Sequence, residues 1–409
     1  MKEFFKVTEL GRVLEYASDF DRVATEEIQL SETTGRILAE DIVSDIDLPG
    51  FARSTMDGYA VRAASTFGAS EANPAYLTLK GSVAMAAAPG FTVGIGEAAK
   101  MPTGGMLPEG SDSVVMVEHT EVIDKTSIEV YRSVAPGQHI LEKGEDFRKG
   151  DIILDCGRKL RPQETGLLAA FGRVTVKVYR NPVIGIISTG DEIVPANEIP
   201  GPGQIRDINT YTLSGLVREA GGIPVTYGIV KDDFDTLFNT CTQALARSDM
   251  VLISGGSSVG TRDYTIEALS ALPEADILVH GIPISPGKPT ILAKAQSKAF
   301  WGLPGHVVSA MIVFDVVVRP FIEHIGGRSS KHKSPSIIPA RLSRNLSSAQ
   351  GRIDYIRVRF VEQNAALWVE PILGKSGLIN TMVKADGLIE IGMNTEGLVK
   401  GAEVSVKLL

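Results

Sequence analysis

Apolar and polar positions follow different patterns in different parts of the chain. Between residues 75 and 135, short alternating runs separated by glycine and proline turns are typical of strands: YLTLKGSVAM, SVVMVEHTEVI and SIEVYRSV. No convincing long helix interrupts these runs, so we expect a small β domain. Ahead of it, VTELGRVLEYASDF has the apolar spacing of an amphipathic helix, and we expect Thr8 to cap that helix.

Residues 181–327 alternate between strand patterns and helix patterns. The segments follow one another at 182–189, 209–222, 224–230, 232–248 and 249–256. The first, third and fifth are apolar runs of strand length, and the second and fourth have helical spacing. This alternation predicts a doubly wound α/β domain with parallel strands buried on both faces.

The α/β region ends in HVVSAMIVFDVVVRPFIEHIGG, which predicts one long buried helix closed by Gly326 and Gly327. The following KHKSPS is polar and contains proline, so we expect a linker. The remaining residues return to an alternating β pattern in YIRVRFV, LWVEPIL, GLIEIG and EVSVKLL. They predict a C-terminal β barrel or sandwich. Two to four domains are expected for 409 residues.

Composition narrows the class of protein. The net charge of −8 argues against nucleic acid or an anionic membrane as the main partner. Cys156 and Cys241 are far apart in sequence, and we expect two reduced thiols rather than a disulfide or a metal pair. No apolar stretch has transmembrane length, and MKEFFKVTEL has no signal-peptide core. We therefore expect a cytoplasmic protein.

Polar residues cluster where predicted strands end. Ligands of open parallel sheets bind beyond the carboxyl ends of the strands, so such residues are candidates for a site. The clusters are Ser188, Thr189, Gly190, Asp191 and Glu192; SGGSSVG at 254–260 with Asp263; and Gly287 with Lys288 in ISPGKPT. Each cluster is weak alone, but together they predict one site at one edge of the sheet.

The SGGSSVG segment raises a conflict of charge. Its backbone N–H groups could hold an anion, whereas Asp263, Asp191 and Glu192 would repel one. No G-x-G-x-x-G is present and no Walker lysine follows Gly260, so a standard nucleotide motif is absent. Magnesium resolves the conflict because it binds carboxylates and phosphate oxygens together. We expect a pyrophosphate-bearing ligand bridged by Mg²⁺. Asp191 could equally be a helix cap or turn residue, and Glu192 a solvated loop residue.

Further polar and glycine-rich segments lie upstream. PGFARSTMDGYAV has little regular pattern and is neither apolar enough for a core strand nor polar enough for a solvated loop. MPTGGMLPEG and GEDFRKGD are predicted turns that contain more polar and charged side chains than a simple turn requires. Their glycines and prolines could simply shape hairpins, and for Pro108 and Gly110 we accept that interpretation.

The order and spacing of these motifs resemble one family over nearly the whole chain. PGFARSTMDGYAV, KMPTGGMLPEG, GEDFRKGD, ISTGDEIV, IRDINTYTL, SGGSSVGTRDYT, PGKP and GLPG together resemble the molybdopterin molybdenumtransferases, which include MoeA-like proteins and the E domain of gephyrin. The resemblance implies a homodimer of elongated four-domain subunits in the cytoplasm. It also implies an enzyme that inserts molybdate into adenylated molybdopterin with Mg²⁺ and releases AMP, in molybdenum cofactor biosynthesis.

The resemblance implies an α/β plus β multidomain fold and a role for each motif residue. The domains would be an elongated α+β domain at 1–45 and 140–180, an inserted β-rich domain at 46–139, an α/β molybdopterin-binding domain at 181–327 and a β barrel at 328–409. The catalytic residues would be Asp57, Thr103, Asp146, Glu192, Asp232 and Asp263. The ligand-binding residues would be Ser188, Gly190, Asp207, Gly255, Gly256, Ser257, Gly260, Lys288, Pro304, Arg352 and Ser376. Magnesium would be held by Asp191, Glu192 and Asp263.

The resemblance also implies how the residues of this set cooperate. In the dimer, Asp57, Thr103 and Asp146 would approach the α/β domain of the other subunit, which explains why the motifs lie far apart in sequence. Lys288 and Pro304 match residues near the molybdate and dithiolene end, and Arg352 and Ser376 match oxyanion-side residues of the C-terminal domain. A tetrahedral dianion suits a lysine, an arginine and a serine.

The chain departs from the family pattern in two motifs. GLPGHVVSA has His306 and Val307 where many members have Asn and Pro, and Ser285 replaces the first lysine of KPGKP. We expect a retained site with altered oxyanion contacts, with His306 capping or packing at the start of a helix. A site tuned for tungstate is the less favoured interpretation.

Two alternative functions stay open at this stage. A molybdopterin adenylyltransferase shares the α/β domain, but it can be a single small domain, so the additional β-rich regions count against it. A gephyrin-like scaffold without catalysis would dimerise but would not need Asp57, Asp146, Glu192 and Asp263 together.

Overall fold

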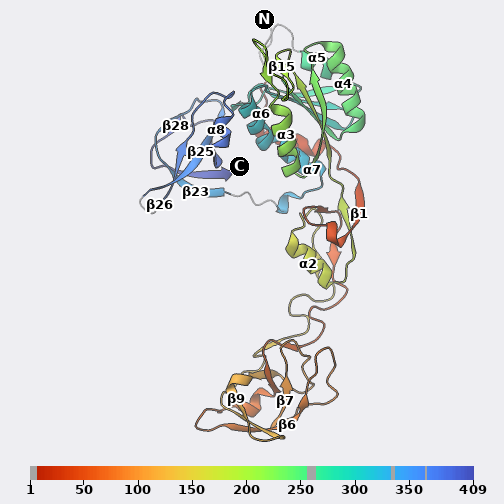
Figure 1. Cartoon of the computed structure of the whole chain (residues 1–409), viewed down its shortest axis with the longest axis vertical. Coiled ribbons are helices and arrows are strands. Elements are labelled where there is room, and N and C mark those ends of the chain that lie inside the picture. The colour runs from red at the N-terminus through yellow and green to blue at the C-terminus, as the bar shows by residue number, and fades with distance from the viewer. Residues whose placement is uncertain (1–6, 256–263, 333–336, 364–365) are drawn as a thin grey trace. The chain divides into compact units, whose positions relative to one another are not determined.

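The computed structural model describes residues 7–255, 264–332, 337–363 and 366–409 (Figure 1). The chain divides into two compact units. One consists of Met1–Glu40, Cys156–Gly166 and Arg173–Leu409, and the other of Asp41–Asp155 and Leu167–Gly172. Gly256, Ser257, Gly260 and Asp263, which the sequence predicts to be site residues, lie outside the described residues.

The unit at 41–155 and 167–172 is built around a sheet with strand order β8-β5-β7-β6-β10-β9. The strands are β5 (Gly58–Val61), β6 (Ala75–Ser82), β7 (Glu97–Met101), β8 (Ser113–Met116), β9 (Thr120–Val122) and β10 (Ser127–Val130). The expected β-rich region is confirmed. One local expectation is wrong, because PGFARSTMDGYAV contains β5, all of whose residues are buried. β5 lies between β7 and β8 and is antiparallel to both.

Short elements complete this unit and begin the other one. In the β-rich unit, β4 (Arg53–Ser54) pairs with β11 (Ile140–Leu141), and β3 (Ile42–Val43) pairs with β12 (Ile152–Leu154). The other unit begins with helix α1 (Leu10–Glu15), whose N-cap is Glu9 rather than the expected Thr8. It also contains helix α2, which begins at Pro162, and a sheet of β1 (Thr25–Gln29), β13 (Thr175–Tyr179) and β2 (Ile37–Leu38).

The α/β sheet has strand order β17-β14-β18-β22-β21-β19. Its strands are β14 (Val183–Thr189), β17 (Ile223–Val230), β18 (Met250–Ser254), β19 (Asp276–His280), β21 (Ile291–Ala295) and β22 (Lys298–Leu303). The first four strands in this order are parallel to one another, whereas β21 is antiparallel to both β22 and β19, so the sheet is mixed and not entirely parallel.

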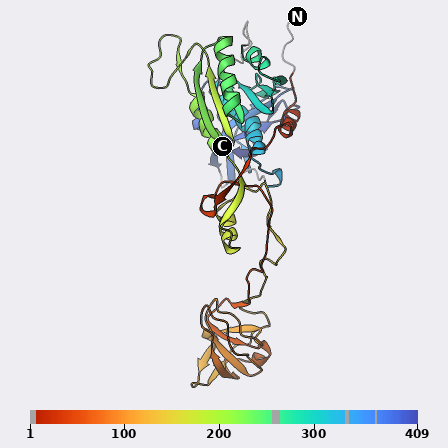
Figure 2. The same ribbon diagram turned by 90° about the vertical axis from the view of Figure 1, so that its right-hand side faces the viewer.

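Alternate residues of the central strands pack into separate cores, as expected for strands buried on both faces. Ile186 and Leu252 belong to a core with α3 (Asn209–Glu219), whereas Ile187 and Ile253 belong to a core with α4 (Phe234–Arg247) and α5 (Tyr264–Ser270). Figure 2 shows this unit from a second direction, with helices beside the sheet. All residues of β18 are buried, which explains its uninterrupted apolar sequence.

The C-terminal region forms a closed barrel. Its strands are β23 (Ile337–Leu342), β25 (Ile353–Gln363), β26 (Ala366–Pro371), β27 (Gly387–Ile391) and β29 (Glu403–Leu408). They follow the order β25-β26-β23-β29-β27, and pairing between β25 and β27 closes the ring. The short strand β20 (Ile284–Ser285) joins this barrel through a parallel pairing with β25, although its sequence lies within the α/β region. The predicted barrel is confirmed.

The long apolar segment after β22 is not one uniform α-helix as expected. It consists of α6 (Val307–Val313), a π-helical turn (Phe314–Val318) and α7 (Arg319–Ile325). Asp315 in the π turn is buried and accepts hydrogen bonds from Arg319 Nε, at 2.8 Å, and from Lys407 Nζ of β29. A charged group inside this apolar segment is therefore paired twice, and one pair ties the barrel to the segment. Across the described part of the chain, no helix is both long and apolar enough to cross a membrane.

We predict that the two thiols react very differently. Burial raises the pKa of the Cys241 thiol to about 12, whereas Cys156 is half-buried. Because the thiolate is the reactive species, Cys241 should stay unmodified in native protein at pH 8 and react only after unfolding. Titration with a thiol-specific chromophoric reagent, with and without denaturant, measures this. Fast labelling of Cys241 in native protein would contradict the packing described for α4, and a Cys156→Ser variant identifies which thiol reacted.

Candidate functional site

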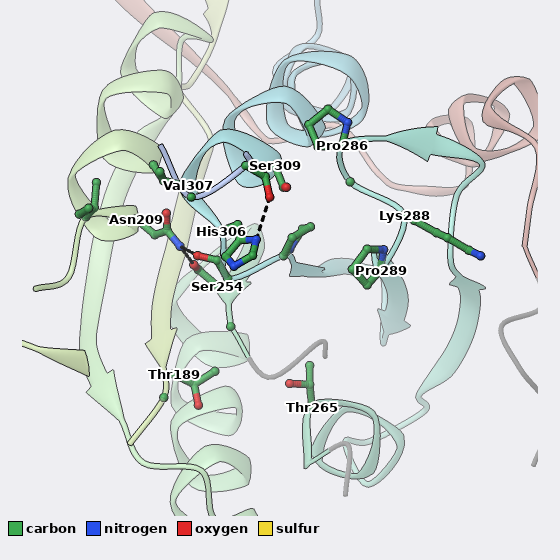
Figure 3. A pocket seen from close by; sticks show the side chains of 18 of the residues that line it. Thr189, Asn209, Ser254, Thr265, Pro286, Lys288, Pro289, His306, Val307 and Ser309 are labelled. Atoms are coloured by element: carbon green, nitrogen blue, oxygen red, sulfur yellow. Dashed lines mark hydrogen bonds between the residues drawn. The ribbon is translucent and has the colours of Figure 1, made fainter. Parts of the chain in front are cut away.

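A cavity of about 1190 Å³ lies where the carboxyl ends of the parallel strands meet loops of the barrel (Figure 3). Segments of both regions form its wall: 188–190, 192–193, 205–209, 254–255, 264–265, 283–289, 304–307, 349–352 and 376–377. Asp232 and Ser309 also line it. The location agrees with the general rule for open α/β sheets.

The turn after β14 brings carboxylates to the cavity. Ser188 and Thr189 end the strand and are buried, and Glu192 lines the cavity with an exposed side chain. Thr189 Oγ1 donates a 2.6 Å hydrogen bond to Asp232 Oδ1, which fixes the carboxylate that follows β17. Glu192 and Asp232 therefore reach the same cavity from neighbouring strand ends.

Asp191 has a structural contact instead. Its Oδ1 accepts a 3.4 Å hydrogen bond from the backbone N–H of Asp232, and it is not among the residues that line the cavity. Within 7–255, 264–332, 337–363 and 366–409, no three His, Cys, Asp or Glu side chains form a group able to hold a metal. Asp263 lies outside these ranges. Glu192 and Asp232 nevertheless fit Mg²⁺, which commonly takes one or two carboxylates together with phosphate oxygens and water.

Gly190 and Gly255 contribute to the site because they lack a side chain. A Cβ on Gly255, whose φ is +108°, would lie 2.1 Å from the carbonyl oxygen of Thr189. The Gly255 N–H already donates to Leu303 O at 3.3 Å, and the Gly190 N–H donates to Val230 O at 3.2 Å. Gly255 thus lets the ends of β18 and β14 approach, whereas a Cβ on Gly190 would meet Ile193 and Glu192 of its own turn. The rest of the anion cradle expected at 256–260 lies outside the described residues.

The motif IRDINTYTL places two buried polar side chains at the start of α3. Asp207 lines the cavity, is 7% exposed and accepts a 3.1 Å hydrogen bond from Thr210 N. Asn209 donates from Nδ2 to Ser254 Oγ at 2.5 Å and to Gly305 O at 2.8 Å. It thereby links α3 to the ends of β18 and β22. Sequence reasoning named Asp207 but missed Asn209, although the motif contains both.

The barrel side of the cavity carries cationic groups. Arg352 Nε contacts Asp354 Oδ1 at 2.9 Å, and Ser348 Oγ donates to Asp354 Oδ2 at 2.6 Å. Burial alone would raise the pKa of Asp354, but hydrogen bonds from Ser348 and Ser285 and the charge of Arg352 outweigh it and lower that pKa. Asp354, which is 4% exposed, therefore stays ionised and orients Arg352. Lys288, in the turn after β20, lines the same cavity.

The third predicted cluster reaches the cavity by an unexpected route. ISPGKPT does not follow a strand of the α/β sheet, because β20 pairs with β25 of the barrel. Gly287, with φ of +128°, is packed so that a Cβ would lie 2.5 Å from Val313 of α6. The turn that carries Lys288 therefore packs between the barrel and helix α6. The turn nevertheless lies at the expected edge of the sheet, because it leads into β21, whose first residue, Ile291, pairs with Gly302 at the end of β22.

His306 occupies the N-cap position of α6, but its side chain makes no capping hydrogen bond. Its Nδ1 instead lies 2.8 Å from Ser376 Oγ, and the backbone N–H of Val308 donates to Ser376 O at 3.1 Å. His306 is therefore the N-cap residue at the helix start, as expected, but its side chain contacts Ser376 and does not bond to the helix backbone. Both His306 and Ser376 line the cavity.

The remaining candidates lie in the β-rich unit. Asp57 Oδ1 accepts hydrogen bonds from Thr103 N at 2.7 Å and from Thr103 Oγ1 at 2.9 Å, and these bonds hold the pKa of Asp57 below its ordinary value. The structure thus brings Asp57 and Thr103 together. Asp146 is exposed, and its backbone N–H donates to Leu48 O at 3.0 Å.

Ten of the predicted residues line the single cavity described above. They are Ser188, Gly190, Glu192, Asp207, Asp232, Gly255, Lys288, Pro304, Arg352 and Ser376. Among these ten, the carboxylates come from the α/β region and the cations Lys288 and Arg352 from the barrel side. Arg206, at the end of β16 (Ile205–Arg206), adds a further cation to the lining. The arrangement suits a ligand with phosphate at one end and a second anion at the other.

Each region of the fold matches a known protein family. Family models match residues 7–172 (MoeA N-terminal region, domains I and II), 185–324 (probable molybdopterin binding domain) and 339–409 (MoeA C-terminal region, domain IV). The chain is 38% identical to a putative molybdopterin biosynthesis protein of Methanocaldococcus jannaschii, over 97% of this chain and 95% of that protein.

A second relative and a solved structure agree. The chain is 32% identical to a molybdopterin molybdenumtransferase of Bacillus subtilis, over 94% of this chain and 90% of that protein. A crystal structure of a molybdopterin biosynthesis MoeA protein from Pyrococcus horikoshii matches with a TM-score of 0.85 and 32% identity, covering 99% of this chain and 100% of that one.

We predict that Asn209→Ala loosens the wall of the cavity. The change leaves Ser254 Oγ and Gly305 O without their amide donor, so the free energy of unfolding should fall by about 2 kcal/mol. Urea denaturation measures this. Asn197→Ala, at an exposed loop position, is the matched control and should change stability by less than about 0.5 kcal/mol. Equal effects of the two substitutions would contradict a structural role for Asn209.

Proposed function

Because the chain belongs to the MoeA family of molybdopterin molybdenumtransferases, enzymes of molybdenum cofactor biosynthesis, we propose that it inserts molybdate into adenylated molybdopterin and releases AMP. The observation that carries this proposal is the single cavity in which strand-end carboxylates face cationic residues of the barrel side. An adenylated pterin and an oxyanion are the two ligands that such a cavity would hold together.

The adenylate end of the substrate belongs at the strand ends. Asp232 is held by Thr189, so its carboxylate is oriented before a ligand arrives. Glu192 and Asp232, with Asp263 as a further predicted acid, would hold Mg²⁺, and when bound it supplies charge neutralisation of the pyrophosphate. Ser188, Gly190, Asp207 and Gly255 shape the wall that receives this part of the ligand.

The molybdate end belongs at the barrel side. Lys288 and Arg352 provide positive charge, and Ser376 provides a hydroxyl donor, which together suit a tetrahedral dianion. Asp354 fixes Arg352, so less side-chain freedom is lost when the anion binds. Pro304 lines the wall between the two ends.

Cleavage of the pyrophosphate needs no nucleophile from the protein. An oxygen of molybdate or of water attacks the phosphorus of the pterin phosphate. The P–O bond that joins this phosphorus to AMP breaks, and its electron pair leaves with AMP. Positioning and charge stabilisation dominate in this class of reaction. The contribution of the chain is therefore to align the oxyanion bound near Arg352 with the phosphate bound near Asp232.

The active form in this proposal is a homodimer with shared sites. Asp57, Thr103 and Asp146 of one subunit would complete the cavity of the partner, as the family resemblance implies. The hydrogen bonds from Thr103 keep Asp57 ionised and oriented, which suits a residue that must act on a ligand arriving from outside its own unit.

Neutralising the strand-end carboxylates should abolish most turnover. Glu192→Gln and Asp232→Asn remove negative charge from the proposed adenylate end, so each should lower kcat by about 100-fold while the protein still folds. Release of AMP from adenylated molybdopterin in the presence of molybdate and Mg²⁺ measures this. Glu198→Gln, at an exposed position in the same loop, is the matched control. Full turnover by both Glu192→Gln and Asp232→Asn would refute the assignment.

Shared sites predict recovery of activity in mixed dimers. Asp57→Asn and Glu192→Gln subunits are each inactive alone, but a mixed dimer contains one site with both carboxylates intact. Reassembly of an equal mixture should restore about a quarter of wild-type turnover, because about half of the dimers are mixed and one of their two sites is complete. Absence of recovery, with mixed dimers verified by mass spectrometry, would show that Asp57 and Glu192 act within one subunit.

A further inference from the structure

His306 presents a polar ring atom to the cavity. Its side chain is exposed and lines the cavity wall between β22 and α6 (Figure 3). Nδ1 is engaged by Ser376 Oγ at 2.8 Å, which leaves Nε2 as the ring nitrogen without a hydrogen-bond partner among the described residues. The bond to Ser376 also fixes the ring, so Nε2 has a defined position before any ligand binds.

The backbone reinforces this arrangement. Val308 N donates to Ser376 O at 3.1 Å, so the start of α6 and the Ser376 segment are joined by a backbone bond beside the side-chain bond. Gly305, the preceding residue, accepts from Asn209 at 2.8 Å. His306 is thus flanked by anchored backbone on one side and by an anchored serine on the other.

We propose that His306 is an oxyanion-binding residue of this chain, donating from Nε2 to the same anion that Ser376 and Arg352 bind, and that its charge state sets the affinity. The inference rests on the proposed function. A neutral imidazole can donate one hydrogen bond, whereas imidazolium donates from both nitrogens and adds positive charge. The anion should therefore bind more tightly on the acidic side of neutrality.

Other charged groups line the same cavity as His306. They are Arg352, Lys288, Arg206, Asp207, Glu192 and Asp232, and Lys375 precedes Ser376 in the chain. Lysine, arginine and carboxylate groups keep their charge between about pH 6 and 8, whereas histidine changes charge in that range. A pH-dependent change of affinity across this range therefore reports on His306.

Calorimetric titration of the full-length protein with molybdate and with tungstate, at about pH 6 and pH 8, tests the proposal. The wild-type affinity should fall about tenfold from the lower to the higher pH, since a charge-assisted bond is lost. His306→Asn should bind about tenfold more weakly than wild type at the lower pH and should show little pH dependence. His306→Gln keeps a donor without charge and should behave in the same way.

Two controls separate this proposal from simpler explanations. His119→Asn, a histidine of the β-rich unit, should leave affinity and its pH dependence unchanged. Thermal unfolding of each variant shows whether the fold is intact. An unchanged affinity and pH profile in both His306→Asn and His306→Gln would overturn the proposal.

The same titrations distinguish a failure of the proposed role of His306 from a failure of the proposed function. If the wild-type protein binds AMP with Mg²⁺ and binds molybdate, but the His306 variants match it, only the role of His306 is wrong. If the wild-type protein binds neither ligand, the proposed function fails and the role of His306 fails with it. A preference between molybdate and tungstate that changes in His306→Asn would further support a direct contact.

Discussion

The close approach of neighbouring strand ends is the constraint on which the site depends. Gly255 lies so near Thr189 that an added Cβ would be 2.1 Å from its carbonyl oxygen, and Gly305 packs beside Gly255, where an added Cβ would make an ordinary contact with Gly255 Cα. Asn209 then ties Ser254 to Gly305. This close packing of the strand ends allows Thr189 to reach Asp232. It also places the start of α6 where His306 contacts Ser376 of the barrel region.

The charges of the cavity come from two sources that are held in different ways. The carboxylates of Glu192 and Asp232 follow strands of the α/β sheet, whose interior is apolar on both faces. Arg352 is oriented instead by a buried carboxylate of the barrel, Asp354, whose own ionisation depends on Ser348, Ser285 and Arg352. Asp232 and Arg352 each have a partner on their own side of the cavity, Thr189 and Asp354, so these two opposite charges are not paired with each other.

Much of the fold could be predicted because buried parallel strands leave continuous apolar runs, as in Met250–Ser254. The family motifs also identified most residues of the cavity. Local patterns failed where long-range pairing decided the structure. β5 is a short strand made regular by two neighbours, and β20 joins a barrel formed by residues far along the chain. The side-chain partner of His306 could not be predicted for the same reason, since Ser376 is 70 residues away.

The pairing of β20 with β25 has a mechanical consequence. The turn that carries Lys288 is covalently part of the α/β region, yet its backbone register is set by the barrel through Ser285 and Asp354. The turn is also bonded to the side of the sheet, because the carbonyl oxygen of Lys288 accepts from Ile282 N at 3.0 Å and from Thr290 N at 2.9 Å. Ser376 is held in the same way, since its carbonyl oxygen accepts from Val308 N of α6 at 3.1 Å. The anion-binding residues therefore belong to the seam that fastens the barrel to the α/β region, so a substitution that loosens this seam would disturb the anion contacts and the attachment of the barrel at once.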